Sequence, residues 1–226
     1  MLTGEMKFAL LALAGRRLLL LSVLLAPPFV VSACTKKPAT PVRSVPVGPA
    51  PDSFRVALAT NRGTVVVQVY RAWAPNGADR FHDLVAEHFF DDNRFFRVLP
   101  GFIAQFGVNT ERKINEAWEA KPLADDPVRQ KNVRGTIVFA SDGPNSRTHQ
   151  FFINLKDNGN LDKDGFAPFG RVVEGMNVVD AIYSGYGESP SYHLIATLGN
   201  SYLTRMFPKL DFIKTVTVTD GGSARP

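Results

Sequence analysis

The chain has 226 residues, of which 45% are hydrophobic and 21% are charged, a balance typical of one globular domain with appendages. Its formal net charge is +5, but residues 1–33 carry +2 of this, because Lys7, Arg16 and Arg17 face a single acidic residue, Glu5. No run of Lys and Arg is interleaved with aromatic residues. We therefore expect no nucleic-acid partner.

Residues 1–33 have the layout of a secretory signal peptide. Arg16 and Arg17 precede the apolar run LLLLSVLLAPPFVV (18–31), which leads through two small residues to Cys34. A charged region, a short apolar region and small residues before a cleavage point are typical of such signals. The run is short for a membrane span and contains a proline pair. A retained N-terminal anchor helix is the alternative interpretation.

The segment VSAC (31–34) resembles the bacterial lipobox, in which the cysteine becomes the first residue of the mature protein and carries lipid. Cys34 is the only cysteine in the chain, so it has no internal disulfide partner. This pattern predicts that residues 1–33 are a signal peptide of the lipoprotein type, and that the mature protein is anchored to a membrane through lipidation of Cys34. The folded domain is then exported, on the periplasmic or extracellular side of the cell envelope.

Residues 34–51 comprise this cysteine and a proline-rich linker. Prolines stand at positions 38, 41, 46, 49 and 51, and no apolar periodicity is present, which favours an extended, semi-rigid chain. A proline-rich ligand for a partner protein is the alternative, but no PxxP core with flanking specificity stands out.

Residues 52–226 predict a mostly-β domain. The segments FRVALAT (54–60) and TVVVQVY (64–70) flank the turn residues Asn-Arg-Gly and predict a β-hairpin. A helix is expected from Pro75 to about Phe90, because apolar residues recur there at helical spacing. Further strands are expected near 94–99, 102–107, 135–141, 150–155, 169–175 and 215–221, with a short helix at 176–184. The polar stretch 109–134 shows no strong periodicity, and no internal repeat is visible.

No metal site and no cofactor are expected. The four histidines, at 82, 88, 149 and 193, have no metal-ligand spacing with cysteine or carboxylates. Residues 160–171 begin like a calcium loop, but Arg171 stands where that loop needs a bidentate glutamate. A turn-forming Asp/Gly loop is the favoured interpretation. The GxSxG motif of a serine nucleophile is absent from the sequence.

Two segments carry the functional signal: FFRVLPGFIAQFG (95–107) and FASDGPNSRTHQFFINL (139–155). They resemble the cyclophilin family of peptidyl-prolyl cis–trans isomerases. The family pattern F-x-R-V-x-P-G-F-x-x-Q is met from Phe95 to Gln105, and G-P-N followed by Q-F-F-I is met between Gly143 and Ile153. The similarity covers roughly 54–187 and resumes at 214–222. It implies a closed eight-stranded antiparallel barrel capped by two helices.

The chemistry of X–Pro rotation explains an arginine in the apolar run at 95–107. Rotation faces a barrier of about 18–20 kcal/mol, because resonance gives the C–N bond double-bond character. In the twisted transition state the proline nitrogen gains a basic lone pair, and a fixed cation that donates a hydrogen bond to it favours that state. Arg97 is therefore the candidate catalytic residue. The alternative is a surface-facing strand position with an ion pair at its rim.

The resemblance implies roles for eight further residues. The proline ring would sit in an apolar pocket, the Arg97 guanidinium and a substrate carbonyl would be held by one glutamine, and the residues before proline would lie in a bordering groove. The corresponding residues are Phe102, Ile103, Phe152 and Leu161 for the pocket, Gln105 for the guanidinium, and Ala140, Ser141 and Gln150 for the groove. Phe151 is expected in the core, because strand alternation turns it away from Phe152.

Two departures from the family pattern stand out. Asn160 occupies the position of a tryptophan found in cyclosporin-sensitive members, and a pocket histidine is replaced near Phe166, so weak cyclosporin binding is expected. Residues 188–213 form an insertion relative to the compact family core. We interpret it as structural, with a partner site as the alternative.

The sequence thus predicts an exported, lipid-anchored peptidyl-prolyl cis–trans isomerase that acts on X–Pro bonds of folding proteins, and that is a monomer. Two other classes remain open. One is a non-catalytic cyclophilin-like chaperone or proline-peptide binding module. The other is a structural envelope lipoprotein, in which substitution of Arg97 would change no binding property.

Overall fold

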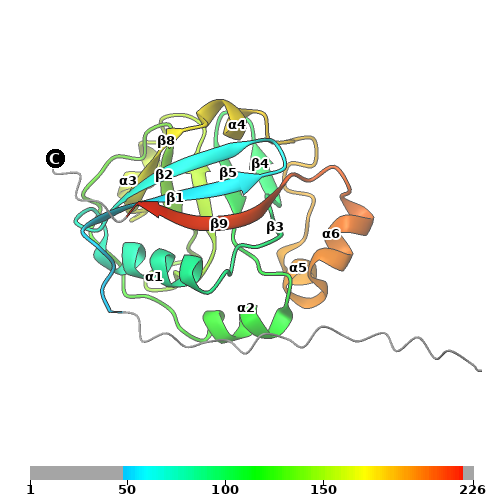
Figure 1. Cartoon of the computed structure of the whole chain (residues 1–226), viewed down its shortest axis with the longest axis horizontal. Helices are drawn as coiled ribbons and strands as arrows, with labels where there is room; N and C mark the ends of the chain where they lie inside the picture. The colour runs from blue at the N-terminus through cyan, green and yellow to red at the C-terminus, as the bar shows by residue number, and fades with distance from the viewer. Residues whose placement is uncertain (1–47, 221–226) are drawn as a thin grey trace, which may run out of the picture. The chain divides into compact units, whose positions relative to one another are not determined.

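The computed structural model describes residues 48–220. They form one curled antiparallel sheet with helices around it (Figure 1). The strands are β1 (Ser53–Thr60), β2 (Thr64–Tyr70), β3 (Asn93–Arg94), β4 (Arg97–Leu99), β5 (Ile103–Phe106), β6 (Thr136–Phe139), β7 (Phe151–Asn154), β8 (Pro168–Glu174) and β9 (Phe212–Asp220). Their order in the sheet is β3-β9-β1-β2-β8-β6-β7-β5-β4. The helices are α1 (Pro75–Ala86), α2 (Arg112–Glu119), α3 (Asn160–Lys163), α4 (Met176–Asp180), α5 (Tyr192–Leu198) and α6 (Asn200–Met206).

Strands β1 and β2 form the predicted hairpin. Val56 pairs with Val67 and Leu58 with Val65, and all four side chains are buried, so strand alternation turns them to the same side of the sheet. At the turn, the Gly63 carbonyl oxygen accepts the Thr60 N–H at 2.8 Å. The prediction from β-branched alternation and turn residues is confirmed.

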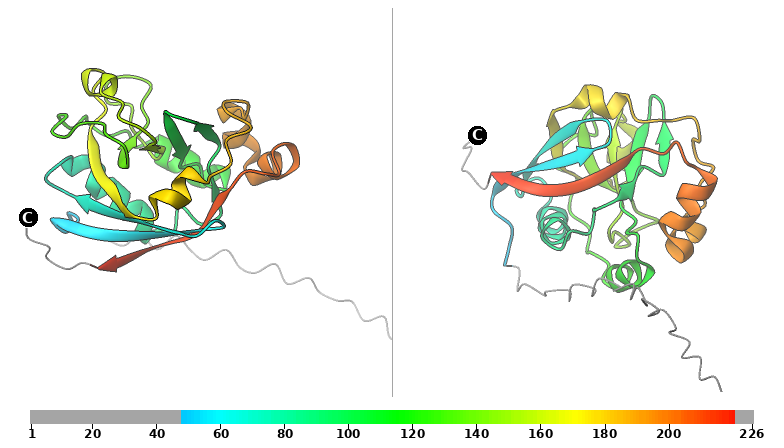
Figure 2. Two further views of the ribbon diagram at one scale, coloured as in Figure 1. Left: turned by 90° about the horizontal axis from the view of Figure 1, so that it is seen from above. Right: turned by 45° about the vertical axis from the view of Figure 1, so that its right-hand side comes forward.

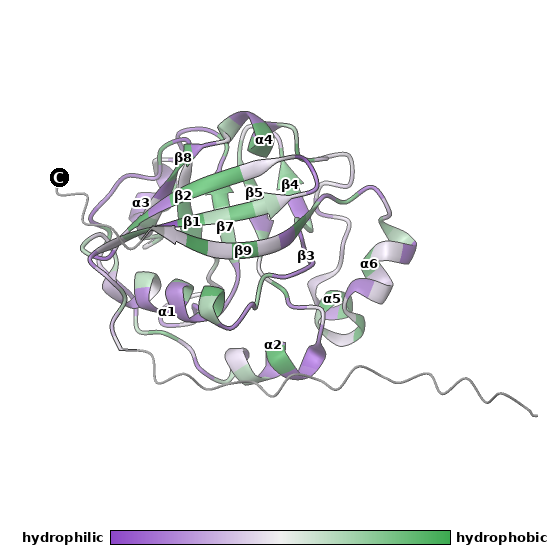
Figure 3. Cartoon of the chain, in the orientation of Figure 1, coloured by the Kyte–Doolittle hydropathy of each residue, from purple (hydrophilic) through white to green (hydrophobic). Residues whose placement is uncertain are grey.

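The core is built largely from phenylalanine. Phe81 of α1 packs against Phe151 of β7 and Phe169 of β8, with ring centroids 5.3 and 5.1 Å apart. Phe139 of β6 lies 4.3 Å from Phe151. Edge and tilted contacts of this kind add to the free energy of apolar burial. Figure 3 shows the same segregation: β1, β2 and β7 are largely green, whereas α1 carries both green and purple residues.

The strand count differs from the prediction of a closed eight-stranded barrel, because the segment expected as one strand at 94–99 divides into β3 and β4. Between them, Phe95 turns into the main core and Phe96 into a second, smaller cluster. The two short strands lie at opposite edges of the sheet, and no hydrogen-bonded ladder joins them within residues 48–220. The antiparallel, mostly-β prediction is confirmed, while nine strands replace eight and closure is not confirmed.

The helices also differ from the prediction of two. Helix α1 ends at Ala86 rather than near Phe90, because His88 and Asp92 adopt φ values of 55° and Phe89 and Phe90 are drawn into the core. Helix α4 stops at Asp180 instead of residue 184. Helix α2 lies in the stretch 109–134, where no element was expected. No helix in the described part of the chain is long and apolar enough to span a bilayer.

Residues 188–213 fold into the helical pair α5 and α6, which lies beside the β3 and β4 edges in two views (Figures 1 and 2). The pair packs around a second hydrophobic cluster, which also includes Phe96 and Val108 from the segments next to β4 and β5. The cluster comprises Phe96, Val108, Ile195, Tyr202, Leu203 and Leu210, with Tyr186 and Phe207 against it.

Candidate active site

A groove of about 730 Å³ runs beside the β4 edge of the sheet. All nine residues predicted for the active site within the domain line it: Arg97, Phe102, Ile103, Gln105, Ala140, Ser141, Gln150, Phe152 and Leu161. They come from β4, the turn before β5, β5, the segment after β6, β7 with the residue before it, and α3. The structure therefore brings the two sequence motifs together, although their roles in catalysis stay predictions. The predicted lipidation site, Cys34, lies outside the described residues.

The polar wall of the groove is a relay of three side chains. Arg97 and Gln105 face each other in the β4–β5 register, and Arg97 Nη1 donates to Gln105 Oε1 at 3.2 Å. Gln105 Nε2 in turn donates to Gln150 Oε1 at 3.0 Å. The Gln105 amide thus accepts from Arg97 through its oxygen and donates to Gln150 through its nitrogen, and these two bonds fix the orientation of the amide. The predicted contact between Gln105 and the guanidinium is present.

The Arg97 guanidinium has a second partner that sequence reasoning did not supply. Its Nε donates to Glu188 Oε1 at 2.7 Å, and its Nη2 donates to the same oxygen. The Arg97 side chain is 31% exposed and that of Glu188 is 60% exposed. The arginine is therefore half-buried and lines the groove, and it also carries the ion pair considered as the alternative to a catalytic role.

The apolar end of the groove is formed by Ile103 and Phe152, both buried, with Phe102, Leu161 and Phe166 packed beside them. Phe166 meets Phe152 edge-on, with centroids 5.8 Å apart. Phe151, which precedes Phe152 on β7, is fully buried in the main core, as strand alternation predicted. This end of the groove offers an apolar surface of the kind that a proline ring can occupy.

The turn between β4 and β5 explains how Phe102 reaches this pocket. Pro100 and Gly101 occupy its centre, and Gly101 has φ of +68°, a value that favours glycine. The Phe102 N–H donates to the Leu99 carbonyl at 2.9 Å and closes the turn. The Phe102 carbonyl accepts from Asn158 Nδ2 at 3.0 Å, which fixes the turn against the segment before α3.

At the far end of the groove, a side chain of α2 contacts a side chain of α5. The Tyr192 hydroxyl donates to the Glu119 carboxylate, and burial together with this carboxylate raises the pKa of Tyr192. Behind Glu119 lies His149, which is fully buried. Burial lowers the pKa of His149, so the ring is neutral near pH 7, and its Nδ1 lies 2.6 Å from the Gly107 carbonyl oxygen, to which it donates as the Nδ1–H tautomer.

Nine residues that line the groove were not among the predicted site residues. They are Phe96, Glu119, Asp142, Ser146, Thr148, Phe166, Glu188, Pro190 and Tyr192. The sequence comparison with the family pattern pointed toward Phe166, because the pocket histidine of the family is replaced near this position. Glu188, Pro190 and Tyr192 belong to the insertion, where no sequence motif pointed to the site. Among residues 48–220, no group of three or more His, Cys, Asp or Glu side chains is placed to hold a metal ion.

Fold and site define a mostly-β protein with an open groove that pairs a fixed cation with an apolar pocket, a site suited to an extended peptide containing proline. The family model described as cyclophilin type peptidyl-prolyl cis-trans isomerase/CLD matches residues 55–197. The chain therefore belongs to the cyclophilin-type peptidyl-prolyl cis–trans isomerases, as the two motifs predicted.

Bacterial relatives agree with this assignment. The chain is 33% identical over 175 residues to peptidyl-prolyl cis-trans isomerase B of Escherichia coli, covering 73% of this chain and 99% of the relative. It is 37% identical over 133 residues to an Acinetobacter baylyi peptidyl-prolyl cis-trans isomerase, covering 56% and 70%.

Solved structures share the fold. A cyclophilin-type isomerase of Cryptosporidium parvum has a TM-score of 0.56 at 20% identity, with 74% of this chain and 98% of the other covered. The cyclophilin AquaCyp293 of Hirschia baltica has a TM-score of 0.57 at 16% identity, with 78% of each chain covered.

Proposed function

We propose that this isomerase accelerates rotation about X–Pro bonds of exported polypeptides, with Arg97 as its catalytic residue. The observation that carries the proposal is the Arg97 guanidinium, which is fixed by Gln105 and lines the same groove as the apolar pocket. A proline ring bound in that pocket would place its nitrogen within reach of the cation. No proton transfer and no covalent intermediate are needed.

The donor geometry suits a twisted transition state. An arginine has five N–H donors, and three of them are used by Gln105 and Glu188. Two N–H groups, one on each Nη, are left for the substrate. Because the guanidinium stays charged throughout, a hydrogen bond to the proline nitrogen strengthens only as that nitrogen loses its resonance, which lowers the barrier rather than the ground state.

The binding-only alternative makes a different prediction for the same residue. A module that only holds proline segments needs the apolar pocket of Phe102 and Phe152, but it gains nothing from a cation that favours the twisted bond. A short Ala-Pro peptide is a suitable probe, because the Cryptosporidium parvum isomerase was also crystallised in the presence of the dipeptide Ala-Pro. Binding and turnover on this peptide separate the two functions.

The experiment measures cis–trans exchange of an Ala-Pro peptide by NMR, with the purified wild type and with Arg97→Ala. We expect the wild type to accelerate exchange and the variant to lose about 10²- to 10³-fold in kcat, the effect of removing one transition-state donor. Peptide affinity should change little, because the pocket is intact. Exchange at the uncatalysed rate with both proteins, while both bind the peptide, would favour the binding module; equal acceleration by both would leave an isomerase in which Arg97 is not catalytic.

We further propose that the chain is an exported lipoprotein. Residues 1–33 would be its signal peptide, 34–51 the lipidated cysteine and linker, and 52–226 the isomerase domain. The lipobox-like VSAC segment and the single cysteine support this layout. The enzyme would assist folding outside the cytoplasm, where uncatalysed proline isomerisation takes tens of seconds and can limit folding.

Membrane attachment is tested by the variant Cys34→Ser. In cells that express the wild type, the protein should sediment with membranes and incorporate labelled fatty acid. Cys34→Ser should lose the label. An unlabelled wild type that remains in the soluble fraction would contradict the anchor without affecting the isomerase assignment.

A further inference from the structure

We propose that Glu188, supplied by the insertion, is a positioning residue for the catalytic arginine. It binds one edge of the Arg97 guanidinium and directs the remaining donors toward the groove. The inference rests on the proposed role of Arg97. It gives the insertion a function in catalysis, whereas the sequence predicted a structural element or a partner site.

Arg97 needs support because of its place in the sheet. Strand β4 has three residues and lies at the edge of the sheet, where β5 is its one partner among the described strands. Within the part of the sheet that the structure describes, the guanidinium donates one side-chain hydrogen bond, the 3.2 Å bond to Gln105. A long side chain on a short edge strand has many rotamers, and ordering it is entropically costly. One bond from one side leaves the guanidinium free to rotate about its terminal torsions.

Glu188 supplies the missing constraint. A single oxygen, Oε1, accepts from Nε, at 2.7 Å, and from Nη2 of Arg97. Two charge-assisted bonds to one edge fix the plane of the guanidinium as well as its position. With Gln105 on Nη1, the cation is held by two different side chains. The donors that remain, one on each Nη, are those assigned above to the substrate.

The backbone around Glu188 is itself well anchored. Glu188 follows Gly187, which has φ of +53°, in a turn closed by the bond from Ser189 N to the Tyr186 carbonyl at 2.9 Å. Tyr186 packs on the small cluster of the insertion, and Pro190 is buried. The carboxylate therefore projects from a turn that is fixed on both sides, although its own side chain is largely exposed.

The insertion and Arg97 are also connected through Phe96. This residue directly precedes Arg97 and is buried in the cluster that holds α5 and α6 together. The packing of the insertion thus sets the backbone of the arginine, while Glu188 sets its side chain.

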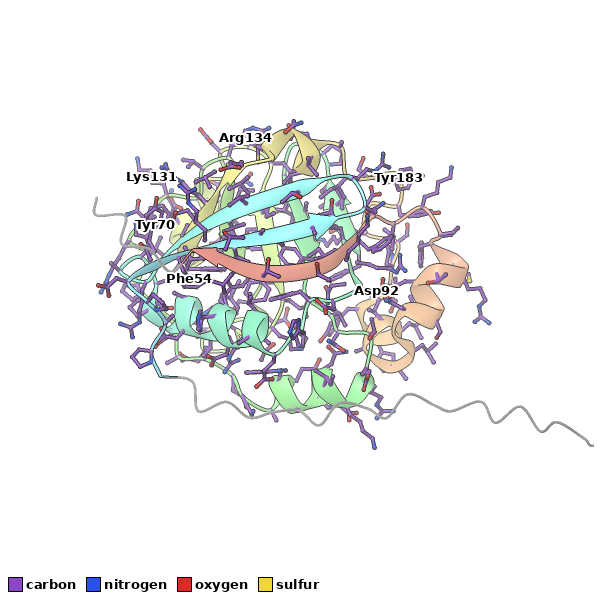
Figure 4. All side chains as sticks on the ribbon, viewed as in Figure 1. Phe54, Tyr70, Asp92, Lys131, Arg134 and Tyr183 are labelled. Carbon is purple, nitrogen blue, oxygen red and sulfur yellow. The ribbon has the colours of Figure 1, made fainter. Side chains whose placement is uncertain are left out.

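The insertion is hydrogen-bonded to the rest of the domain through Asp211 near its C-terminal end and Asn200 at the start of α6. The Tyr183 N–H donates to Asp211 Oδ2 at 2.7 Å, and Asp211 Oδ1 accepts from Arg62 Nε at 2.8 Å. Asn200 Nδ2 donates to the Asp92 carboxylate at 2.8 Å. Tyr183 and Asp92 are labelled in Figure 4. These contacts hold the segment that carries Glu188 in a fixed place relative to the sheet.

A competing role for Glu188 is inhibition, in which the carboxylate must leave before a substrate can bind. The donor count favours positioning, because two N–H groups of Arg97 are available while Glu188 is bound. The two roles predict opposite changes in rate on removal of the carboxylate, so one series of variants separates them.

The experiment compares Glu188→Ala and Glu188→Gln with the wild type in the NMR exchange assay on the Ala-Pro peptide. Glu188→Ala should lower kcat about three- to fivefold, the upper range for an exposed ion pair, with KM within about twofold of the wild type. Glu188→Gln keeps an oxygen that can accept the same N–H groups, and should retain more than about half of the wild-type kcat.

The matched control is Glu116→Ala. Glu116 accepts from Arg112 Nε at 2.6 Å on α2, its side chain is 51% exposed against 60% for Glu188, and it does not line the groove. This variant makes the same charge change and should leave kcat at the wild-type value. The Arg97 Nε–H resonance in NMR gives a readout independent of activity, and it should be protected from solvent exchange in the wild type and lose protection in Glu188→Ala.

Each other outcome is decisive. A higher kcat/KM for Glu188→Ala would show that the carboxylate competes with the substrate and would overturn the inference. An unchanged kcat, or an equal loss in Glu116→Ala, would also overturn it. If the wild type does not accelerate exchange, or if Arg97→Ala is as active as the wild type, it is the proposed function of Arg97 that fails, which is a distinguishable result.

Discussion

Asp126 and Arg147 form a buried ion pair, and Asp126→Asn tests its contribution to stability. Asp126 Oδ2 accepts from Arg147 Nη1 at 3.0 Å and from the Gly77 N–H at 2.9 Å, while its Oδ1 accepts from the Asn76 N–H at 3.0 Å. The carboxylate thus caps α1 from outside, in place of the cap residue Ala74, which makes no side-chain bond. Asp126 and Arg147 are 6% and 3% exposed.

The asparagine has nearly the same shape but turns one acceptor oxygen into an N–H donor. In either orientation of the amide, that donor faces a backbone N–H, and the Arg147 charge loses its buried counterion. Breaking a buried pair on one side costs about 3–5 kcal/mol. Arg147 keeps its bond to Asp125 Oδ1 at 3.2 Å, so we expect the lower end, about 3 kcal/mol. For a domain of this size, that lowers Tm by roughly 6–12 °C.

The measurement is urea unfolding followed by circular dichroism, with the wild type, Asp126→Asn and the control Asp125→Asn. Asp125 binds the same arginine, but its side chain is 39% exposed, so its variant should lose less than about 1 kcal/mol. Isomerase activity should be retained by both variants at temperatures where they are folded, because neither carboxylate contacts the Arg97 relay. A loss below about 1 kcal/mol for Asp126→Asn, or equal losses for both, would refute the argument from burial.

Four further predictions concern the site and its surroundings. Gln150→Ala removes the acceptor for Gln105 Nε2, and it should lower kcat/KM several-fold, by about 1 kcal/mol, with Tm unchanged; a lower Tm with full activity would contradict the relay. Gly107→Ala would place a Cβ 2.3 Å from the His149 carbonyl oxygen at φ of +110°, so thermal unfolding should show a markedly less stable protein, and a wild-type Tm would refute this. Burial depresses the pKa of His149 below its ordinary 6.5, so the unfolded chain binds more protons there and the free energy of unfolding should decline as pH falls below about 6.5; urea titrations should show a shallower slope for His149→Gln. Because Asn160 replaces the tryptophan of cyclosporin-sensitive members, calorimetry should show weak cyclosporin binding, and a nanomolar Kd would contradict this prediction.

The sequence determined the family, seven of the eight expected strands and one wall of the site. The resemblance implied the contact of Gln105 with Arg97, and the structure explains it, because the two residues flank a Pro-Gly turn within one short hairpin whose register pairs them. The second motif predicted Phe152 toward the groove and Phe151 toward the core, because alternation along a strand has a period of two. These are local relations, and local patterns are sufficient for them.

Helix α2 shows where local patterns fail. Among its eight residues only Asn115 and Trp118 are buried, so the apolar periodicity that would predict a helix is too weak to detect. Its start is supported by the bond between Asn115 Oδ1 and the Asn109 N–H at 2.7 Å, and Trp118 lies under the Arg80 guanidinium at 4.8 Å. Tertiary contacts stabilise this helix, as is common for short helices.

Only the tertiary structure decided what holds the Arg97 guanidinium from the outer side. Glu188 is 91 positions from Arg97 in the chain, and it reaches the groove because the insertion packs on Phe96 and is hydrogen-bonded to the rest of the domain through Asn200 and Asp211. No local pattern encodes the path of such a segment, since its position depends on burial of side chains from distant elements. The same holds for the division of the strand at 94–99, which occurs because Phe95 and Phe96 are buried in two different clusters.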